Sequence, residues 1–149
     1  MPEGEQEKAI AEGAREVLET MFFAEVLGPA PAEAVLEDER WVRLEFQGNP
    51  PGRLSVGVSA PAARRMAADF LGVEDAEALS EAQVGEVLCE LANMIGGSIL
   101  SRLESETIFD LGRPEAAASA PEEAGAGVVC CRFDLGDGML AVRLAMRGG

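Results

Sequence analysis

The sequence predicts an α+β domain of two layers, in which two long helices pack on one face of a mostly antiparallel sheet. Two observations support this prediction. The strand patterns come in pairs separated by short turns, which is typical of hairpins, and the helical patterns lie between these pairs. A chain of 149 residues also fits one domain, at about 100–200 residues per domain. We therefore treat residues 1–149 as a single domain.

The start of the chain is predicted to be helical. Residues 1–7 form a polar, flexible lead-in, and apolar residues at helical spacing predict a helix over 8–27, with acidic residues on another side. Gly28 and Pro29 are predicted to end this helix, because glycine commonly follows a helix and proline cannot continue one. Residues 31–40 are predicted to form a loop.

A hairpin and a second helix are predicted next. Residues 41–47 and 53–58 alternate between apolar and polar side chains, which indicates two half-buried strands. The segment 48–52 between them is rich in glycine and proline and predicts the turn. A helix is predicted over 62–71, with Pro61 at its start.

The C-terminal part is predicted to contain further strands. Residues 107–111 form a short strand, and 112–127 have low complexity and no apolar period, which predicts a mobile loop. Residues 128–135 and 139–146 are rich in strand-forming residues, and the turn 136–138 joins them into a second hairpin.

The longest predicted helix follows Ser80 and runs to about Leu103. Ser80 is a favourable N-cap, and Gln83 three residues later completes a capping box. At about 100° per residue, one side of this helix is apolar and forms its core face. The six residues of that face are Val84, Val87, Leu88, Leu91, Ile95 and Ile99.

The opposite side of this helix forms one polar stripe. Its members are Glu86, Glu90, Asn93 and Gly97. Inside a helix, asparagine costs several tenths of a kcal/mol and glycine about 1 kcal/mol relative to alanine, and a solvent face offers no packing gain in return. The simplest interpretation is that the acids are solvated and that Gly96 and Gly97 admit a neighbouring helix. The combination instead suggests a partner that approaches the glycine while a carboxylate and an amide project into its surface.

Composition excludes several kinds of function. The chain has 27 acidic and 12 basic residues, a net charge of −15, and no histidine. Without histidine, Ser-His-Asp catalysis, Cys-His catalysis and histidine metal sites are excluded. A surface this acidic repels phosphate backbones and anionic lipids, so we expect neither a nucleic acid nor a membrane as a partner.

The cysteines predict a reducing, cytoplasmic environment. Cys89, Cys130 and Cys131 form no disulfide framework and no CxxC site, because neighbouring residues of a strand point to opposite faces. The N-terminus is not a signal peptide, and no apolar run approaches the roughly 18 residues of a membrane span. A redox role is an alternative, although no Lys, Arg or His lies near Cys89 in the sequence to lower its pKa.

The segment Glu90-Leu-Ala-Asn93-Met-Ile-Gly-Gly resembles the signature helix of the CheC/CheX/FliY chemotaxis phosphatases. In that signature an acidic or Ser residue is followed by Glu, then by Asn, and roughly twenty residues later by Pro; Glu86, Glu90, Asn93 and Pro114 match it. Residues 15–23 are also similar to the opening helix of CheX-like domains. CheC-like members carry a second site in that helix, but here Glu replaces its Asn, so the chain resembles CheX-like members.

The resemblance implies an aspartyl-phosphate phosphatase that acts on the phosphorylated receiver domain of a CheY-like response regulator. It implies that Asn93 orients the attacking water, that Glu90 docks in the partner, and that Glu86, Gly96 and Gly97 bind the partner. The receiver would supply Mg²⁺, so we expect no cofactor and no metal of the chain's own. The residues suit this chemistry, because phosphoryl transfer depends on positioning and a carboxamide both donates and accepts hydrogen bonds.

Two further alternatives follow from the resemblance. The same stripe could serve a non-catalytic binding module that docks a receiver or a flagellar-switch protein. CheX-like proteins are also often homodimers that join sheet edges, which this sequence neither indicates nor excludes. The net charge of −15 raises a separate question, because receiver sites are themselves acidic and long-range attraction would be poor.

Overall fold

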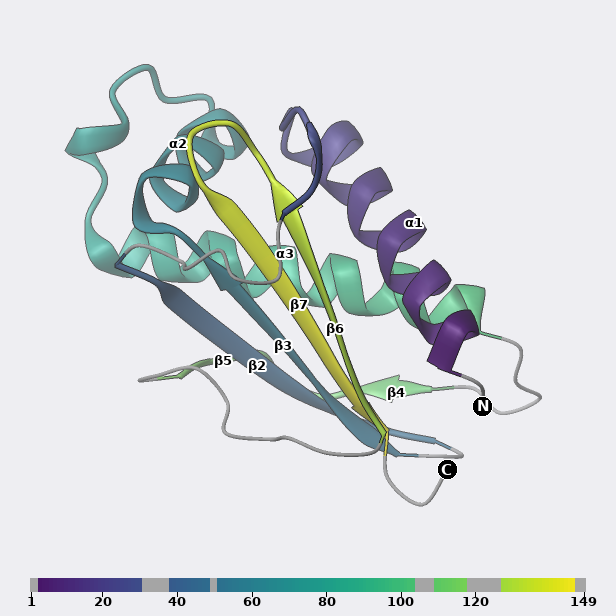
Figure 1. Cartoon of the computed structure of the whole chain (residues 1–149). Coiled ribbons are helices and arrows are strands. Elements are labelled where there is room, and N and C mark those ends of the chain that lie inside the picture. The colour runs from purple at the N-terminus through teal and green to yellow at the C-terminus, as the bar shows by residue number, and fades with distance from the viewer. Residues whose placement is uncertain (1–2, 31–37, 49–50, 104–108, 118–126, 147–149) are drawn as a thin grey trace.

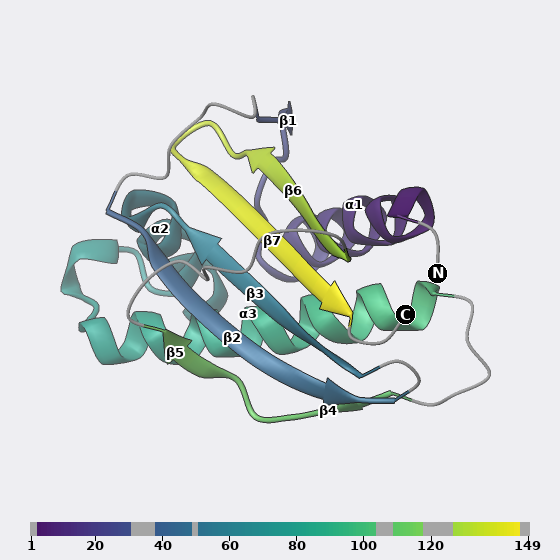
Figure 2. The same cartoon turned by 60° about the horizontal axis from the view of Figure 1, so that its bottom comes forward.

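The computed structural model describes residues 3–30, 38–48, 51–103, 109–117 and 127–146. Its elements, in chain order, are α1 (Glu3–Met21), β1 (Gly28–Pro29), β2 (Arg40–Gln47), β3 (Gly52–Val58), α2 (Ala60–Leu71), the 3₁₀-helix η1 (Ala76–Ala78), α3 (Glu81–Arg102), β4 (Asp110–Leu111), β5 (Glu115–Ala117), β6 (Val128–Asp134) and β7 (Met139–Met146). The strands form one antiparallel sheet in the order β1-β6-β7-β3-β2-β4, and β5 also pairs with β2. The helices lie on one side of this sheet (Figures 1 and 2). The predicted α+β class and both predicted hairpins are confirmed.

The core lies between the three central strands and the helices. The register places Leu44 of β2 opposite Leu54 of β3, and Leu54 opposite Leu144 of β7. All three side chains are buried. Because alternate residues of a strand share one face, this row and its neighbours form a continuous apolar surface. Helices α1 and α3 cover that surface and contact each other.

Helix α3 begins and packs as the sequence predicts. The Gln83 backbone N–H donates to Ser80 Oγ at 3.1 Å, and the Ser80 N–H donates to Gln83 Oε1 at 2.8 Å, which completes the capping box. All six predicted core-face residues are buried. By length and mean hydropathy alone, α3 could cross a membrane, although the sequence suggested no such segment. Half of its most apolar stretch is buried inside the fold, as expected of a core helix.

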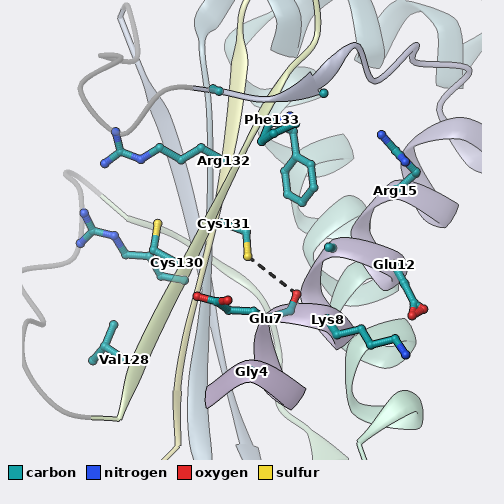
Figure 3. Close-up of a pocket in the computed structure, with 15 residues that line it drawn as sticks. Gly4, Glu7, Lys8, Glu12, Arg15, Val128, Cys130, Cys131, Arg132 and Phe133 are labelled. Carbon is teal, nitrogen blue, oxygen red and sulfur yellow. Dashed lines mark hydrogen bonds between the residues drawn. The ribbon is translucent and has the colours of Figure 1, made fainter. Parts of the chain in front are cut away.

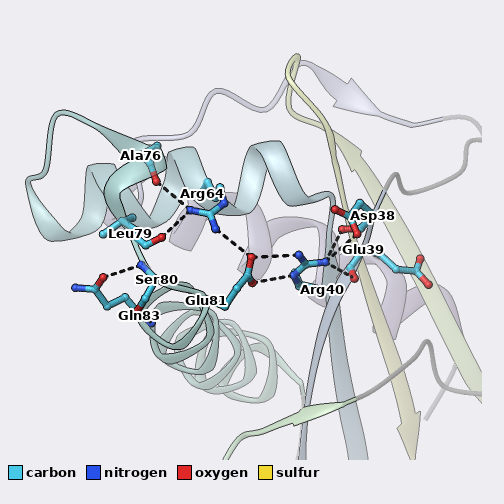
Figure 4. A network of polar contacts seen from close by, with 9 residues as sticks. All are labelled: Asp38, Glu39, Arg40, Arg64, Ala76, Leu79, Ser80, Glu81 and Gln83. Atoms are coloured by element: carbon cyan, nitrogen blue, oxygen red, sulfur yellow. Dashed lines mark hydrogen bonds and ion pairs between the residues drawn. The ribbon is translucent and has the colours of Figure 1, made fainter.

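A polar network holds the N-terminal end of α3 against β2 and α2 (Figure 4). Glu81 Oε2 accepts from Arg40 Nε at 3.2 Å, and Glu81 Oε1 accepts from Arg64 Nη2 at 3.0 Å. Arg64 also donates to the backbone oxygens of Ala76 and Leu79. Hydrogen bonds from Arg40 and then Arg64 lower the pKa of the Glu81 carboxyl. The network therefore fixes where α3 starts relative to the sheet.

The N-terminal helix differs from its prediction at both ends. It begins at Glu3 rather than at residue 8, and it ends at Met21 rather than at residue 27. The end is set by Phe22, which is buried and stacks on Phe70 of α2 at 4.8 Å, and by Phe23, whose φ of +54° is not helical. The segment 28–29 then pairs with β6 as β1, so it forms an edge strand and does not directly follow the helix.

The segment after α3 also differs from its prediction. Residues 115–117 were expected to belong to a mobile loop, but they form β5 and pair with Arg43, Val42 and Trp41 of β2. The expected strand over 107–111 is present as β4 at its last two residues. The rest of these predicted segments, at 107–108 and 118–126, lies outside the described residues, as do residues 1–2 of the lead-in and 31–37 of the first loop.

Candidate functional site

The predicted polar stripe lies on the outer side of α3. Glu86, Glu90 and Asn93 are exposed, and Gly97 is half-buried. Because these residues follow one another at three- and four-residue spacing, successive turns of one helix carry them on one face. The α3 backbone beneath them is held by the capping box and the buried core face, so the side chains start from a rigid support.

The stripe faces a groove with a volume of about 950 Å³. One wall is α3, which contributes Glu86, Glu90 and Asn93. The other parts of the lining come from the end of α2 and from the β4–β5 segment, which contributes Arg113 and Pro114. The structure thus brings the three polar residues together with the proline that the family signature places some twenty residues further along the chain.

The two glycines of the signature lie in different environments. A Cβ at Gly96 would lie 2.9 Å from Leu111 Cδ2 and 3.2 Å from Leu54 Cδ2, whereas a Cβ at Gly97 would meet only Leu111 Cδ1, at 3.9 Å. Gly96 is therefore buried against the sheet, and the expectation that it contacts a partner does not fit its position. Gly97 does not line the groove, but the space around its Cβ position is open and stays available for a close approach.

Cys89 also lines the groove, one turn before Asn93. Its thiol donates to the backbone oxygen of Pro114 at 3.8 Å, which ties α3 to the opposite wall. Burial, followed by the charges of Glu90 and Glu86, raises the pKa of the Cys89 thiol. A thiol that stays protonated is a poor nucleophile, so this position does not favour the alternative redox role.

An exposed apolar rim borders the groove at the end of α2. Leu71 is 46% exposed and Val73 is 37% exposed, and Gly72 between them adopts a left-handed conformation with φ +72° that ends the helix. Exposed apolar side chains beside a groove are a common feature of protein-binding surfaces. The sequence does not point to Leu71, because only the packing of α2 on α3 brings it to the groove.

A larger groove, of about 1060 Å³, lies between α1 and β6 (Figure 3). Two thiols, Cys130 and Cys131, line it. The Cys131 thiol donates to the backbone oxygen of Glu7 at 3.9 Å, and burial raises the pKa of Cys131 to about 11. The lining contains no carboxamide and none of the predicted site residues, so size alone does not make it the better candidate. Its charged lining residues are Glu7, Glu12, Lys8, Arg15, Arg132 and Arg143.

Within the described residues, no group of three or more His, Cys, Asp or Glu side chains could hold a metal ion. The acidic side chains that line the groove, Glu81, Glu86 and Glu90, all belong to α3, and Glu81 is paired with Arg40 and Arg64.

Comparison with solved structures shows which fold this is. A chain of the CheX-CheY-BeF3-Mg²⁺ complex from Borrelia burgdorferi is 20% identical, with 94% of this chain and 96% of that chain covered and a TM-score of 0.76. The chemotaxis protein CheX from Desulfovibrio desulfuricans is 19% identical, with 96% and 99% covered and a TM-score of 0.73. FliY from Thermotoga maritima is 13% identical, with 99% and 92% covered and a TM-score of 0.59. At these identities the similarity establishes the fold alone.

Comparison with protein families adds a match in sequence. Curated protein sequences give no match. The family model for the chemotaxis phosphatase CheX matches residues 41–134, more than half of the chain, and this span includes α3 and the whole β4–β5 wall of the groove. The chain therefore belongs to the CheX family of chemotaxis phosphatases.

Proposed function

We propose that this protein hydrolyses the phospho-aspartate of a CheY-like receiver domain, with Asn93 and Glu90 as its catalytic pair. The observation that carries the proposal is the exposed Glu86–Glu90–Asn93 stripe that lines one groove with Pro114. Membership of the CheX family supports it. Further support comes from the fold shared with a chain of a complex that contains CheX, CheY, BeF3 and Mg²⁺.

Each residue of the stripe has a chemical part in this proposal. Asn93 can both donate and accept hydrogen bonds, so its carboxamide can hold a water in line with the phosphorus. Glu90 can pair with a cationic side chain of the receiver and fix the register of docking. Glu86, one turn earlier, extends that contact, and Gly97 leaves room for the partner's backbone to approach α3.

The metal in this proposal belongs to the partner. Phosphoryl transfer from an aspartyl phosphate needs charge neutralisation by a cation, which we assign to Mg²⁺ held in the receiver. This chain would then supply the positioned water and the docking surface. We expect turnover to depend on Mg²⁺ through the receiver alone.

The decisive experiment is the decay of phosphorylated receivers. Purified CheY-type receivers of the source organism are phosphorylated with acetyl phosphate and Mg²⁺, and phosphate release is followed with this protein at sub-stoichiometric amounts. We expect the wild type to accelerate decay and Asn93→Ala to lower kcat by roughly 100-fold or more, the loss typical of removing a group that stabilises the transition state. The variant should keep the thermal stability of the wild type, because Asn93 is exposed.

A matched control separates catalysis from a general effect of mutation. Gln47→Ala also removes an exposed carboxamide, but from β2 and outside this groove, so it should retain full activity. Turnover by Asn93→Ala at the wild-type rate would refute the assignment. If the wild type protects the phosphorylated receiver only in stoichiometric amounts, the protein is the non-catalytic binding module instead.

A further inference from the structure

The wall of the groove that faces α3 carries a cation, Arg113. Leu111 packs at Gly96 of α3, and the backbone oxygen of Pro114 lies 3.8 Å from the Cys89 thiol, which is nearly two turns earlier in the helix. The chain from 111 to 114 therefore runs along α3 in the direction opposite to the helix. Arg113, between these two contacts, lies beside the turn that carries Glu90 and Asn93, and it lines the same groove.

The backbone around Arg113 is anchored on both sides. The Gly112 N–H donates to the Glu45 backbone oxygen at 2.7 Å, and a Cβ at Gly112 would lie 2.7 Å from that oxygen. Immediately after Pro114, Glu115 pairs with Arg43 of β2. The guanidinium thus extends from a support that is fixed to the sheet, as Asn93 extends from a fixed helix.

Arg113 is also distinguished by its charge environment. It is exposed, and among the described residues it has no ion-pair partner, in contrast to Arg40 and Arg64, which share Glu81. The other charged residues that line the groove are the acids Glu81, Glu86 and Glu90. Because Arg113 has no ion-pair partner among the described residues, its guanidinium is available to an incoming anion.

We propose that Arg113 is a partner-binding residue that recognises an anionic group of the receiver, either its phosphoryl group or the carboxylates around it. The proposal rests on the proposed function and answers a difficulty in it, because a chain with a net charge of −15 would otherwise meet an acidic receiver site with repulsion alone. Guanidinium binds both carboxylate and phosphoryl oxygens through paired hydrogen bonds. The attraction between Arg113 and the receiver thus acts at short range, at the site itself.

The test compares Arg113→Ala, Arg113→Glu and Arg113→Lys in the same assay of receiver dephosphorylation. We expect Arg113→Ala to raise KM about ten-fold, as loss of one charge-assisted contact does, and to leave kcat within about two-fold. Arg113→Glu should raise KM further, and Arg113→Lys should restore part of the loss. The control is Arg15→Ala, which removes an exposed cation from α1 outside this groove and should leave KM unchanged.

Binding to the receiver with and without BeF3⁻, which mimics the phosphoryl group, identifies the anion. A loss of affinity confined to the BeF3⁻ form assigns the contact to the phosphoryl group, and an equal loss in both forms assigns it to carboxylates. An unchanged KM in Arg113→Ala, or an equal rise in Arg15→Ala, overturns the inference while leaving the proposed function intact. Loss of the wild-type acceleration itself would instead count against the proposed function.

Discussion

Gly96 and Gly97 are neighbours in the sequence but do different things in the fold. Gly96 allows α3 to lie against Leu54 and Leu111, whereas Gly97 is half-buried and has only Leu111 Cδ1 near its Cβ position. One step along a helix rotates the side-chain direction by about 100°, which is enough to separate core from surface. The sequence predicted a role for both, but it could not distinguish them because the residue that fills the space, Leu111, comes from a distant segment.

The two glycines therefore predict opposite effects on stability. Gly96→Val should lower the free energy of unfolding by about 2 kcal/mol, because an isopropyl group must enter a filled site. Gly97→Ala is the matched control and should raise the free energy of unfolding by up to about 1 kcal/mol, because alanine is the better helix former and open space receives its methyl group. Urea denaturation of both variants measures the difference, and an equal response would contradict these assignments.

The elements that were predicted well have strong local signals. The capping box of Ser80 and Gln83, the alternation over 41–47 and the turn at 136–138 each depend on residues a few positions apart. Strands β1 and β5 were not predicted, because Gly28 and Pro29 are poor strand formers and the β5 sequence does not alternate. Both strands form because an edge of the sheet was available to pair with them.

The capping box at Ser80 should contribute to the stability of the whole of α3. Ser80→Ala removes the acceptor for the Gln83 N–H, and the loss of such a cap costs about 1 kcal/mol. The midpoint of thermal unfolding should therefore fall by a few degrees. Ser101→Ala, an exposed serine in the last turn of the same helix, should not lower it, and a similar fall in both variants would argue against the cap. Activity well below the midpoint should be unchanged.

At the scale of the whole molecule, the sequence identified the architecture and the helix that carries the candidate site. It did not identify Leu71 and Arg113 as parts of the groove, since these two residues meet α3 only through tertiary contacts. The cytoplasmic location remains a prediction, and the homodimer remains an alternative suggested by the family resemblance. The catalytic roles of Glu90 and Asn93 also remain predictions, for which the groove now provides a defined setting.

The net charge of −15 predicts how stability responds to salt. Like charges destabilise a compact state by mutual repulsion, whereas exposed ion pairs such as Arg53–Glu45 each contribute little. Raising NaCl from about 20 to about 200 mM shortens the screening length to less than 10 Å, so the midpoint of thermal unfolding should rise. Potassium chloride should act equally, because screening depends on ionic strength. A midpoint that falls with salt would mean that the ion pairs outweigh the repulsion.

The spacing of residues along α3 sets a distance that any partner must match. With a rise of about 1.5 Å per residue, Glu86 and Asn93 are separated by about 10.5 Å along the axis. A receiver displaced by one turn toward the N-terminus would still find a carboxylate, since Glu86 then stands where Glu90 should be. It would find Cys89 in the place of Asn93, and a thiol cannot replace the carboxamide. The helix thus admits more than one alignment of its acids but offers only one in which a carboxamide follows them.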